Sequence, residues 1–224
     1  LQAVAFAKGG GPVSGIFSRT WGTTGGIPLV LLHGFTETGG VWEEAAELLG
    51  KSRRIHAPDL PGHGKTSVRP SSFSGVVKSL EAWADAEDIR DAHLLGYSMG
   101  GRLALAWAFQ NPNRWRSLTL ESASAGIESA CERDERGERD RRLADRILEI
   151  GIRAFLNEWE SQPLFDSFQE CSLKRRERLR KQKEENSGVG LSYASQVLSP
   201  ANQPSFWDGL ATLPIPAHFI AGGQ

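Results

Sequence analysis

Short apolar runs alternate with helix-like stretches over the first half of the chain. Five runs are rich in apolar residues and end at turn or loop residues: 27–32, 54–57, 93–96, 117–120 and 217–221. Between the first four lie three segments of helical character: 41–49, 73–86 and 99–109. Strands that alternate with helices predict βαβ units and a mostly parallel sheet with helices on both of its faces.

A long charged stretch breaks this alternation after Leu120. It contains no strand pattern but three charged, helix-forming segments: 132–150, 152–160 and 174–185. A stretch of this length is too long for a loop, so it predicts an inserted helical lid over the sheet. We therefore expect the N-terminal part of the core in residues 1–123, the lid in 124–205 and a return to the core in 206–224.

The segment from His93 to Gly101 predicts a strand that enters a G-x-S-x-G turn and opens a helix. This context is typical of a nucleophile elbow, with Ser98 exposed at the carboxyl end of its strand as the catalytic serine. The amide of Met99 would then face a developing oxyanion at the N-terminus of the helix. Because small residues in a turn also produce this string by chance, the alternative is a connector with a surface serine.

A second motif, Leu31-Leu32-His33-Gly34-Phe35, follows the first predicted strand. Folds with a nucleophile elbow place the other oxyanion-hole amide here, so we expect the backbone N–H of Phe35 to be that donor. For His33 we favour a structural role, fixing this loop by hydrogen bonds. The turn at residues 59–64 follows the second strand and is expected to be structural. The three motifs, in this order, resemble the α/β-hydrolase fold.

A catalytic serine needs a base, and a histidine base needs an acid that orients it. In this fold both follow the serine, with the acid before the histidine. Four of the five histidines precede Ser98, and His218 lies within the last predicted strand. Glu121 is the alternative acid. Because the chain runs from Leu1 to Gln224 without these partners, we expect an excised piece whose last strand, helices and triad partners lie beyond residue 224, and which is inactive alone.

Motifs of the predicted lid resemble those of the 2-succinyl-6-hydroxy-2,4-cyclohexadiene-1-carboxylate synthase family of menaquinone and phylloquinone biosynthesis. The resemblance covers about residue 28 to residue 224, and the elbow followed by Arg102 also matches. The lid motifs separate this family from generic esterases. They are Leu120-Glu121-Ser122-Ala123-Ser124, Glu135-Arg136-x-x-Arg139-Asp140-x-x-Leu143-Ala144, Asn157-Glu158-Trp159-Glu160-Ser161-Gln162-Pro163-Leu164-Phe165 and Gln203-Pro204-Ser205-Phe206-Trp207.

The resemblance implies a lyase that eliminates pyruvate from a cyclohexene bearing a succinyl ketone, a ring carboxylate and an enolpyruvyl ether. Ser98 would act as the base, and no cofactor or metal is needed because the ketone accepts the charge. The substrate carries three carboxylates, which guanidinium groups bind in a bidentate manner. Two other hypotheses stay open: a serine hydrolase of an ester, thioester or carbon–carbon bond, and a non-catalytic ligand-binding module.

Five residues are candidates for binding this substrate. Arg102 lies one turn after Ser98 on an otherwise apolar helix, where the alternative is a buried ion pair with the lid. Arg136 matches a family arginine, although its helix is dense in charges that face water. Trp159 and Tyr97 match pocket aromatics and could equally serve packing. Lys183 stands where bacterial relatives carry an arginine, and its alternative is a solvated helix face.

Composition and charge limit the classes of binding partner expected for this chain. The chain has 224 residues, 39% of them hydrophobic and 24% charged, and a net charge of −1. This balance argues against a dedicated nucleic-acid or membrane-surface binder. No apolar run approaches the ~20 residues of a membrane span. We expect a small tricarboxylate as partner, fusion to or cooperation with other quinone-pathway enzymes, and a location in the cytoplasm of a bacterium or the plastid stroma of a plant or alga.

Overall fold

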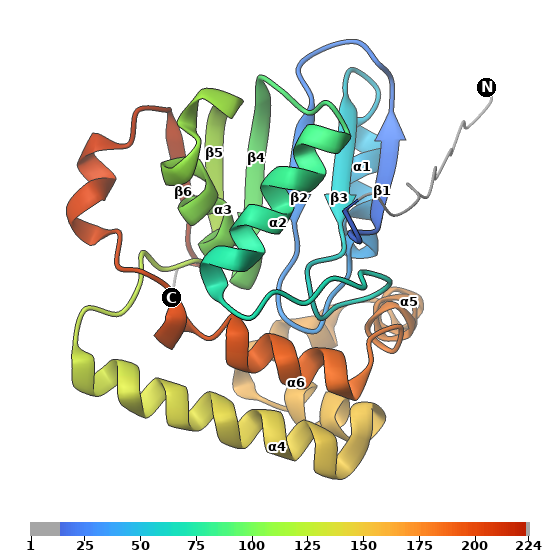
Figure 1. Ribbon diagram of the computed structural model, residues 1–224. Coiled ribbons are helices and arrows are strands. Elements are labelled where there is room, and N and C mark those ends of the chain that lie inside the picture. The colour runs from blue at the N-terminus through green and yellow to red at the C-terminus, as the bar shows by residue number, and fades with distance from the viewer. Residues whose placement is uncertain (1–13, 223–224) are drawn as a thin grey trace.

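The computed structural model describes residues 14–222. In this part of the chain, six strands form one sheet in the order β1-β3-β2-β4-β5-β6 (Figure 1). β1 pairs antiparallel with β3, and every other pairing is parallel. The strands are β1 (Ser18–Gly22), β2 (Leu29–Leu32), β3 (Arg54–Pro58), β4 (Ala92–Tyr97), β5 (Trp115–Glu121) and β6 (Ala217–Ile220).

The sequence pattern identified the five parallel strands but missed β1. This strand reads Ser-Arg-Thr-Trp-Gly, which is mostly polar and carries no apolar run. It lies at an edge of the sheet, where only its pairing with β3 and a few half-buried side chains are required. An edge strand that is solvated on much of its surface leaves a weak hydrophobic signal.

Helices cover both faces of the sheet, as predicted. The helices of the core are α1 (Glu43–Leu49), α2 (Phe73–Ala86) and α3 (Met99–Gln110). Alternate residues of β2 divide between the two faces: Val30 and Leu32 belong to the cluster formed with α2 and α3, whereas Leu29 and Leu31 pack with Ala46 of α1. This side-chain period of two is the reason that a fully apolar strand identifies the centre of the sheet.

The segment between β5 and β6 is helical, and we call residues 124–205 the helical insertion. Figure 1 shows it as a separate layer beneath the sheet. Its helices are α4 (Ala130–Glu160), η3 (Pro163–Glu170), α5 (Leu173–Lys183), α6 (Gly188–Val197) and η4 (Pro200–Asn202), and η5 (Trp207–Thr212) follows it. Gly151, with φ 76° and ψ 165°, interrupts α4 at the place where the sequence separates two helical segments.

The helix α6 was not predicted, because four of its ten residues are glycine or serine, which lower its helix propensity. Tertiary packing stabilises it instead: Leu191 and Ala194 are buried, and α6 packs against α4. The side chain of Ser187 caps the helix by accepting a hydrogen bond from the Gly190 amide.

At the other edge of the sheet, β6 exposes apolar side chains. Phe219 is 59% and Ile220 52% exposed, and β6 is the last strand in the described sheet. An exposed apolar edge of this kind favours pairing with another strand.

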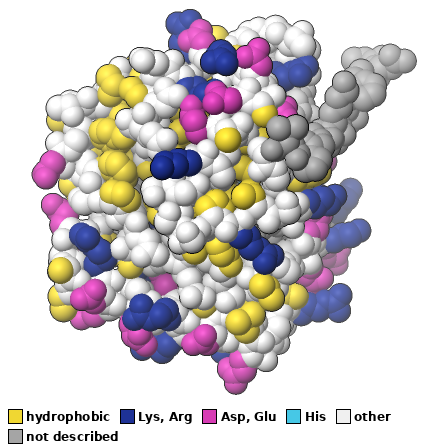
Figure 2. Space-filling model, viewed as in Figure 1, with side chains coloured by type: hydrophobic (Ala, Val, Ile, Leu, Met, Phe, Trp, Pro, Cys, Tyr) yellow, Lys and Arg dark blue, Asp and Glu magenta, His cyan; other side chains and the backbone are white. Residues whose placement is uncertain are grey.

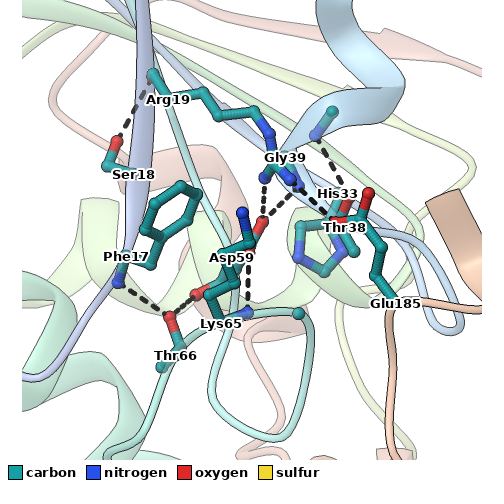
Figure 3. Close-up of polar contacts among 12 residues, drawn as sticks. Phe17, Ser18, Arg19, His33, Thr38, Gly39, Asp59, Lys65, Thr66 and Glu185 are labelled. Atoms are coloured by element: carbon teal, nitrogen blue, oxygen red, sulfur yellow. Dashed lines mark hydrogen bonds and ion pairs between the residues drawn. The ribbon is translucent and has the colours of Figure 1, made fainter. Parts of the chain in front are cut away.

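A buried carboxylate joins the carboxyl end of β3 to three neighbouring segments (Figure 3). Asp59 is 0% exposed and accepts hydrogen bonds from the Gly39 amide at 2.8 Å and the Lys65 amide at 2.9 Å. Arg19 of β1 forms an ion pair with it and a second one with Glu185 at 3.1 Å. The Asp59 contacts therefore connect β1, the turn at Lys65, the 3₁₀ helix η1 (Gly39–Trp42) and, through Arg19, the connection between α5 and α6 in the helical insertion.

We expect Asp59→Ala to lower the free energy of unfolding by about 3–5 kcal/mol, because it leaves the Arg19 guanidinium and two amides without their buried acceptor. Denaturant titration followed by circular dichroism measures the change. Glu149→Ala is the matched control, since Glu149 pairs with Arg146 on the surface and is 69% exposed. A surface pair of this kind contributes ~0–1 kcal/mol, so equal losses in the two variants would contradict the role assigned to Asp59.

Candidate active site

Ser98 lies at the sharp turn between β4 and α3. Its backbone has φ 48° and ψ −111°, a strained conformation for a residue with a side chain. Two hydrogen bonds hold this turn: the Ser98 amide donates to the Glu121 carbonyl at 2.8 Å, and the Arg102 amide donates to the Ser98 carbonyl at 3.1 Å. The Ser98 side chain does not cap the helix, so its hydroxyl is available for chemistry.

Close backbone contacts explain the glycines that flank this serine. A Cβ on Gly96 would lie 2.5 Å from the Gly100 carbonyl oxygen, and one on Gly100 would lie 2.4 Å from the Leu32 carbonyl oxygen. Both distances are shorter than any real contact, so neither position accepts a side chain without a shift of the backbone. The G-x-S-x-G string is here a packing requirement of the elbow.

Phe35 and Met99 line the same cavity as Ser98. Among residues 14–222, neither of their amides donates a hydrogen bond within the chain. Met99 is the first residue of α3, where the amide has no helical acceptor. Unpaired amides in two residues that share a cavity with a serine are groups that can stabilise a developing oxyanion.

His33 holds the peptide unit that contains the Phe35 amide. The Gly34 carbonyl, which belongs to this unit, lies 2.8 Å from His33 Nδ1. The Leu60 amide donates to His33 Nε2 at 2.9 Å, so Nε2 is the acceptor and Nδ1 carries the proton. Burial lowers the pKa of His33 to about 4, which keeps the ring neutral. These contacts support the structural role that the sequence suggested.

Glu37 and Tyr97 flank the same loop. Glu37 Oε2 accepts a hydrogen bond from the Gly34 amide at 3.0 Å, and burial raises the pKa of Glu37. The Tyr97 ring lies so close to Gly34 that a Cβ there would be 2.8 Å from Cδ1. Burial, with Glu37 and Glu121 nearby, raises the pKa of Tyr97. Tyr97 thus packs on the oxyanion loop and is not part of the cavity wall.

The cavity next to Ser98 has a volume of about 310 Å³ and lies between the carboxyl ends of the strands and the helical insertion. It brings together six of the eight predicted site residues: Phe35, Ser98, Met99, Arg102, Arg136 and Trp159. The remaining wall comes from residues without a predicted role: Ser122, Ala123, Ser124, Asp140, Leu143, Leu164, Ala194, Ser195, Leu198, Ser199 and Pro200.

Arg102 is a buried cation on this wall. The residue is 9% exposed, and its Nη2 donates to the Leu198 carbonyl at 2.7 Å. Its Nη1 is buried and has no hydrogen-bond partner. Burial and the neighbouring Arg136 lower the pKa of Arg102 to about 10, while Asp140 opposes this shift. Arg102 therefore stays charged near neutral pH, and its unpaired Nη1 is available for an anion in the cavity.

Arg136 reaches the cavity from α4 and is paired there. Its Nε lies 3.0 Å and 2.9 Å from the two carboxylate oxygens of Asp140. Asp140 also accepts a hydrogen bond from the Ser199 hydroxyl at 2.5 Å. The four-residue spacing of Arg136 and Asp140 is visible in the sequence, but the approach of Ser199 is not.

Trp159 belongs to an aromatic cluster and to the cavity wall at once. Its ring centroid lies 5.3 Å from that of Phe35, 5.8 Å from Phe155 and 5.9 Å from Phe165. Phe35 belongs to the predicted oxyanion loop, so this packing connects the insertion to that loop.

Lys183 lies away from the cavity wall. The residue is 8% exposed, and its Nζ pairs with Glu160 at 2.9 Å. The ring of Phe168 lies 5.1 Å from the same Nζ, a cation–π contact. Lys183 thus packs inside the insertion rather than on a solvated helix face, and Glu160 neutralises its charge.

The described histidines are engaged elsewhere or lie away from Ser98. His63 is buried, with a pKa lowered by that burial to about 3, and His93 Nδ1 lies 2.8 Å from the Ser117 hydroxyl. His56 is buried on β3, and His218 is exposed on β6. In residues 14–222 no histidine or carboxylate makes a hydrogen bond to the Ser98 side chain.

Metal-ligand clusters and membrane-spanning helices are both absent from residues 14–222. No group of three or more histidine, cysteine, aspartate or glutamate side chains is arranged to hold a metal ion there. Cys131 and Cys171 are both free. Within the same residues, every helix is too short or too polar to cross a bilayer.

Comparison with known proteins identifies the family of this chain. The family model described as the alpha/beta hydrolase fold matches residues 27–220. A Bacillus subtilis protein whose name assigns it provisionally as a 2-succinyl-6-hydroxy-2,4-cyclohexadiene-1-carboxylate synthase is 37% identical over 87% of this chain and 72% of its own. The synthase of that name from Salmonella agona is 30% identical over 90% of this chain and 79% of its own.

Two solved structures extend the comparison. MenH from S. aureus superposes with a TM-score of 0.83 at 28% identity, over 90% of this chain and 78% of its own. A thermophilic esterase from Thermogutta terrifontis superposes with a TM-score of 0.79 at 27% identity, over 92% of this chain and 75% of its own. The chain therefore belongs to the α/β-hydrolase family and, within it, to the 2-succinyl-6-hydroxy-2,4-cyclohexadiene-1-carboxylate synthases.

Proposed function

We propose that this protein eliminates pyruvate from 2-succinyl-5-enolpyruvyl-6-hydroxy-3-cyclohexene-1-carboxylate, the reaction of menaquinone and phylloquinone biosynthesis. The observation that supports it most directly is Arg102, a buried guanidinium with an unpaired Nη1 on the wall that also carries Ser98. A buried cation is costly unless an anion pairs with it, and the substrate supplies carboxylates. A neutral ester would supply no anion to pair with the buried Arg102 guanidinium.

The two oxyanion amides suit this elimination. A base removes the proton beside the succinyl ketone, and the electron pair of the broken C–H bond moves toward the ketone oxygen. The amides of Phe35 and Met99 stabilise the resulting charge. The electrons then return as the C–O bond to the enolpyruvyl group breaks, and the leaving group takes up a proton to become pyruvate. Ser98 supplies the base, so no covalent intermediate and no cofactor are required.

Ser98 needs a proton acceptor that the described histidines do not provide. His33 and His63 are buried with lowered pKa values. The ring nitrogens of His33 face the Gly34 carbonyl and the Leu60 amide, and His63 Nδ1 lies 3.4 Å from the Pro61 carbonyl, while its Nε2 is buried without a hydrogen-bond partner. The relatives extend beyond the matched region, since this chain covers 72% and 79% of the two synthases. We place the histidine and the acid that activate Ser98 outside residues 14–222.

We assign the helical insertion the role of a lid that binds the carboxylates of the substrate. It contributes Arg136 and Trp159 to the cavity and supplies the Leu198 carbonyl that holds Arg102. Tyr97 and Lys183 then act indirectly: Tyr97 supports the oxyanion loop, and Lys183 pairs with Glu160 within the lid.

Without the missing base, residues 1–224 are expected to release no pyruvate above background, because a neutral serine hydroxyl is a poor proton acceptor near pH 7. A coupled pyruvate assay compares this chain with one extended at its carboxyl end to the length of the relatives. Equal rates would show that a group within residues 1–224, such as Glu121 or His63, activates Ser98.

In the extended enzyme, Ser98→Ala is expected to lower kcat for pyruvate release by about 10³-fold or more, since it removes the base. Ser122→Ala is the control, because Ser122 lines the same cavity without a place in the elbow. Near-normal turnover in Ser98→Ala would exclude the role of Ser98 as the base. Hydrolysis of simple esters at a higher kcat/KM than pyruvate release would favour the hydrolase alternative.

Arg102→Ala is expected to lower kcat/KM by a factor equivalent to about 2–5 kcal/mol, the range for the loss of one partner of a buried charge pair. Arg102→Lys should recover only part of the loss, because an ammonium lacks the guanidinium fork. Thermal unfolding of both variants serves as the control. If the variant unfolds while its folded fraction keeps normal kinetics, Arg102 is a structural cation only.

A further inference from the structure

One carboxylate lies in a cavity whose other charged groups are both arginines. Arg102, Arg136 and Asp140 are the charged residues on the described wall, which leaves a net charge of +1. At a site that binds an anion, a carboxylate repels the ligand, and a low-dielectric environment strengthens this repulsion. Asp140 therefore opposes binding unless it contributes something else to the site.

The contacts of Asp140 show that its orientation is fixed. The residue is 6% exposed, and both of its carboxylate oxygens accept from Arg136 Nε, at 3.0 Å and 2.9 Å. The hydroxyl of Ser199 donates to Oδ2 at 2.5 Å, and Ser199 itself accepts from the Ala201 amide at 3.1 Å. Asp140 is thus held by Arg136 of its own helix α4 and by Ser199, which caps η4.

This fixed carboxylate restrains a side chain that is otherwise half exposed. The side chain of Arg136 is 41% exposed, and an unrestrained arginine samples many rotamers in water. Asp140 engages only Nε, so both Nη atoms of Arg136 remain without a hydrogen bond within residues 14–222. The Arg136 guanidinium is thus held through Nε, and its two Nη atoms remain able to donate to a ligand.

We propose that Asp140 is a positioning residue, which holds the Arg136 guanidinium at the cavity wall so that its Nη atoms meet a substrate carboxylate. This inference rests on the proposed function only in requiring that the cavity binds an anion. The competing interpretation is a purely structural ion pair within α4, whose carboxylate also links that helix to Ser199 at the start of η4. The two interpretations predict opposite changes in anion affinity when the Asp140 carboxylate is removed. Loss of a bystander carboxylate removes repulsion and tightens anion binding, whereas loss of a positioning carboxylate weakens it.

The test is a titration of the 1–224 chain with succinate, followed by NMR. Asp140→Asn keeps the shape of the side chain and removes its charge, and we expect its Kd for succinate to rise about fivefold to tenfold. Glu138→Gln removes a carboxylate from the same helix, where Glu138 pairs with Arg141 and Arg142 at the surface, and should leave Kd unchanged. Succinamide, which is uncharged, is the control ligand.

A double-mutant cycle separates positioning from a structural role. Because Asp140 acts through Arg136, Asp140→Asn should cause no further loss of affinity in the Arg136→Ala background, where only the repulsion between Asp140 and the anion remains to be removed. Ser199→Ala, a smaller change that keeps the ion pair, should raise Kd in the same direction by about twofold.

Unchanged or tighter succinate binding in Asp140→Asn, additive losses in the double variant, or no saturable binding by the parent chain would each overturn the proposal. Should Asp140→Asn fail to fold, Ser199→Ala decides in the same way. The assay needs no turnover, so a failure of pyruvate release contradicts the proposed reaction without touching this result.

Discussion

The buried carboxylate of Asp59 is the contact on which the geometry of the site depends. It receives the Gly39 and Lys65 amides and the Arg19 guanidinium at the carboxyl end of β3. The next residue, Leu60, donates its amide to His33, which in turn holds the Gly34 carbonyl. Since Gly34 and Phe35 share this peptide unit, the orientation of one oxyanion donor follows from a chain of buried hydrogen bonds that begins beside Asp59.

The second donor depends on close packing rather than on polar contacts. The Met99 amide begins α3, and the turn before it can form only because Gly96 and Gly100 let backbones approach within distances that exclude a Cβ. The positive φ of Ser98 is strain that the buried helix and the neighbouring strands compensate. Polar contacts thus restrain the backbone at Phe35 and steric contacts restrain it at Met99, the two donors of the proposed oxyanion hole.

The two arginines of the cavity are held in place in different ways. Arg102 is deeply buried and keeps one unpaired nitrogen, whereas Arg136 is half exposed and held by Asp140. One arginine is thus immobilised by burial and the other by a countercharge. Removal of water strengthens both interactions with a carboxylate, because the dielectric constant around them is low. The helical insertion supplies Arg136, Asp140 and the Leu198 carbonyl, so its position over the sheet determines the geometry of the proposed anion site.

Local sequence determined the parts of this protein that follow from chain periodicity and backbone sterics. The buried strands, the helices on both faces, the elbow at Ser98 and the oxyanion loop at Phe35 were all predictable, because each is encoded by residues adjacent in the chain. Family motifs placed Arg102, Arg136 and Trp159, and the cavity includes all three. The sequence pattern did not reveal the polar edge strand β1 or the helix α6, since strand pairing and helix packing stabilise them despite their own weak propensity.

Only the tertiary structure decided which of the candidate side chains meet. Arg102 is held by the Leu198 carbonyl, 96 residues away, and Asp140 by Ser199, 59 residues away. Lys183 is paired with Glu160, and Tyr97 packs on Gly34 instead of entering the cavity. These contacts depend on how the insertion docks on the sheet. Docking is the sum of many weak, long-range contacts, and no short segment of sequence carries that information.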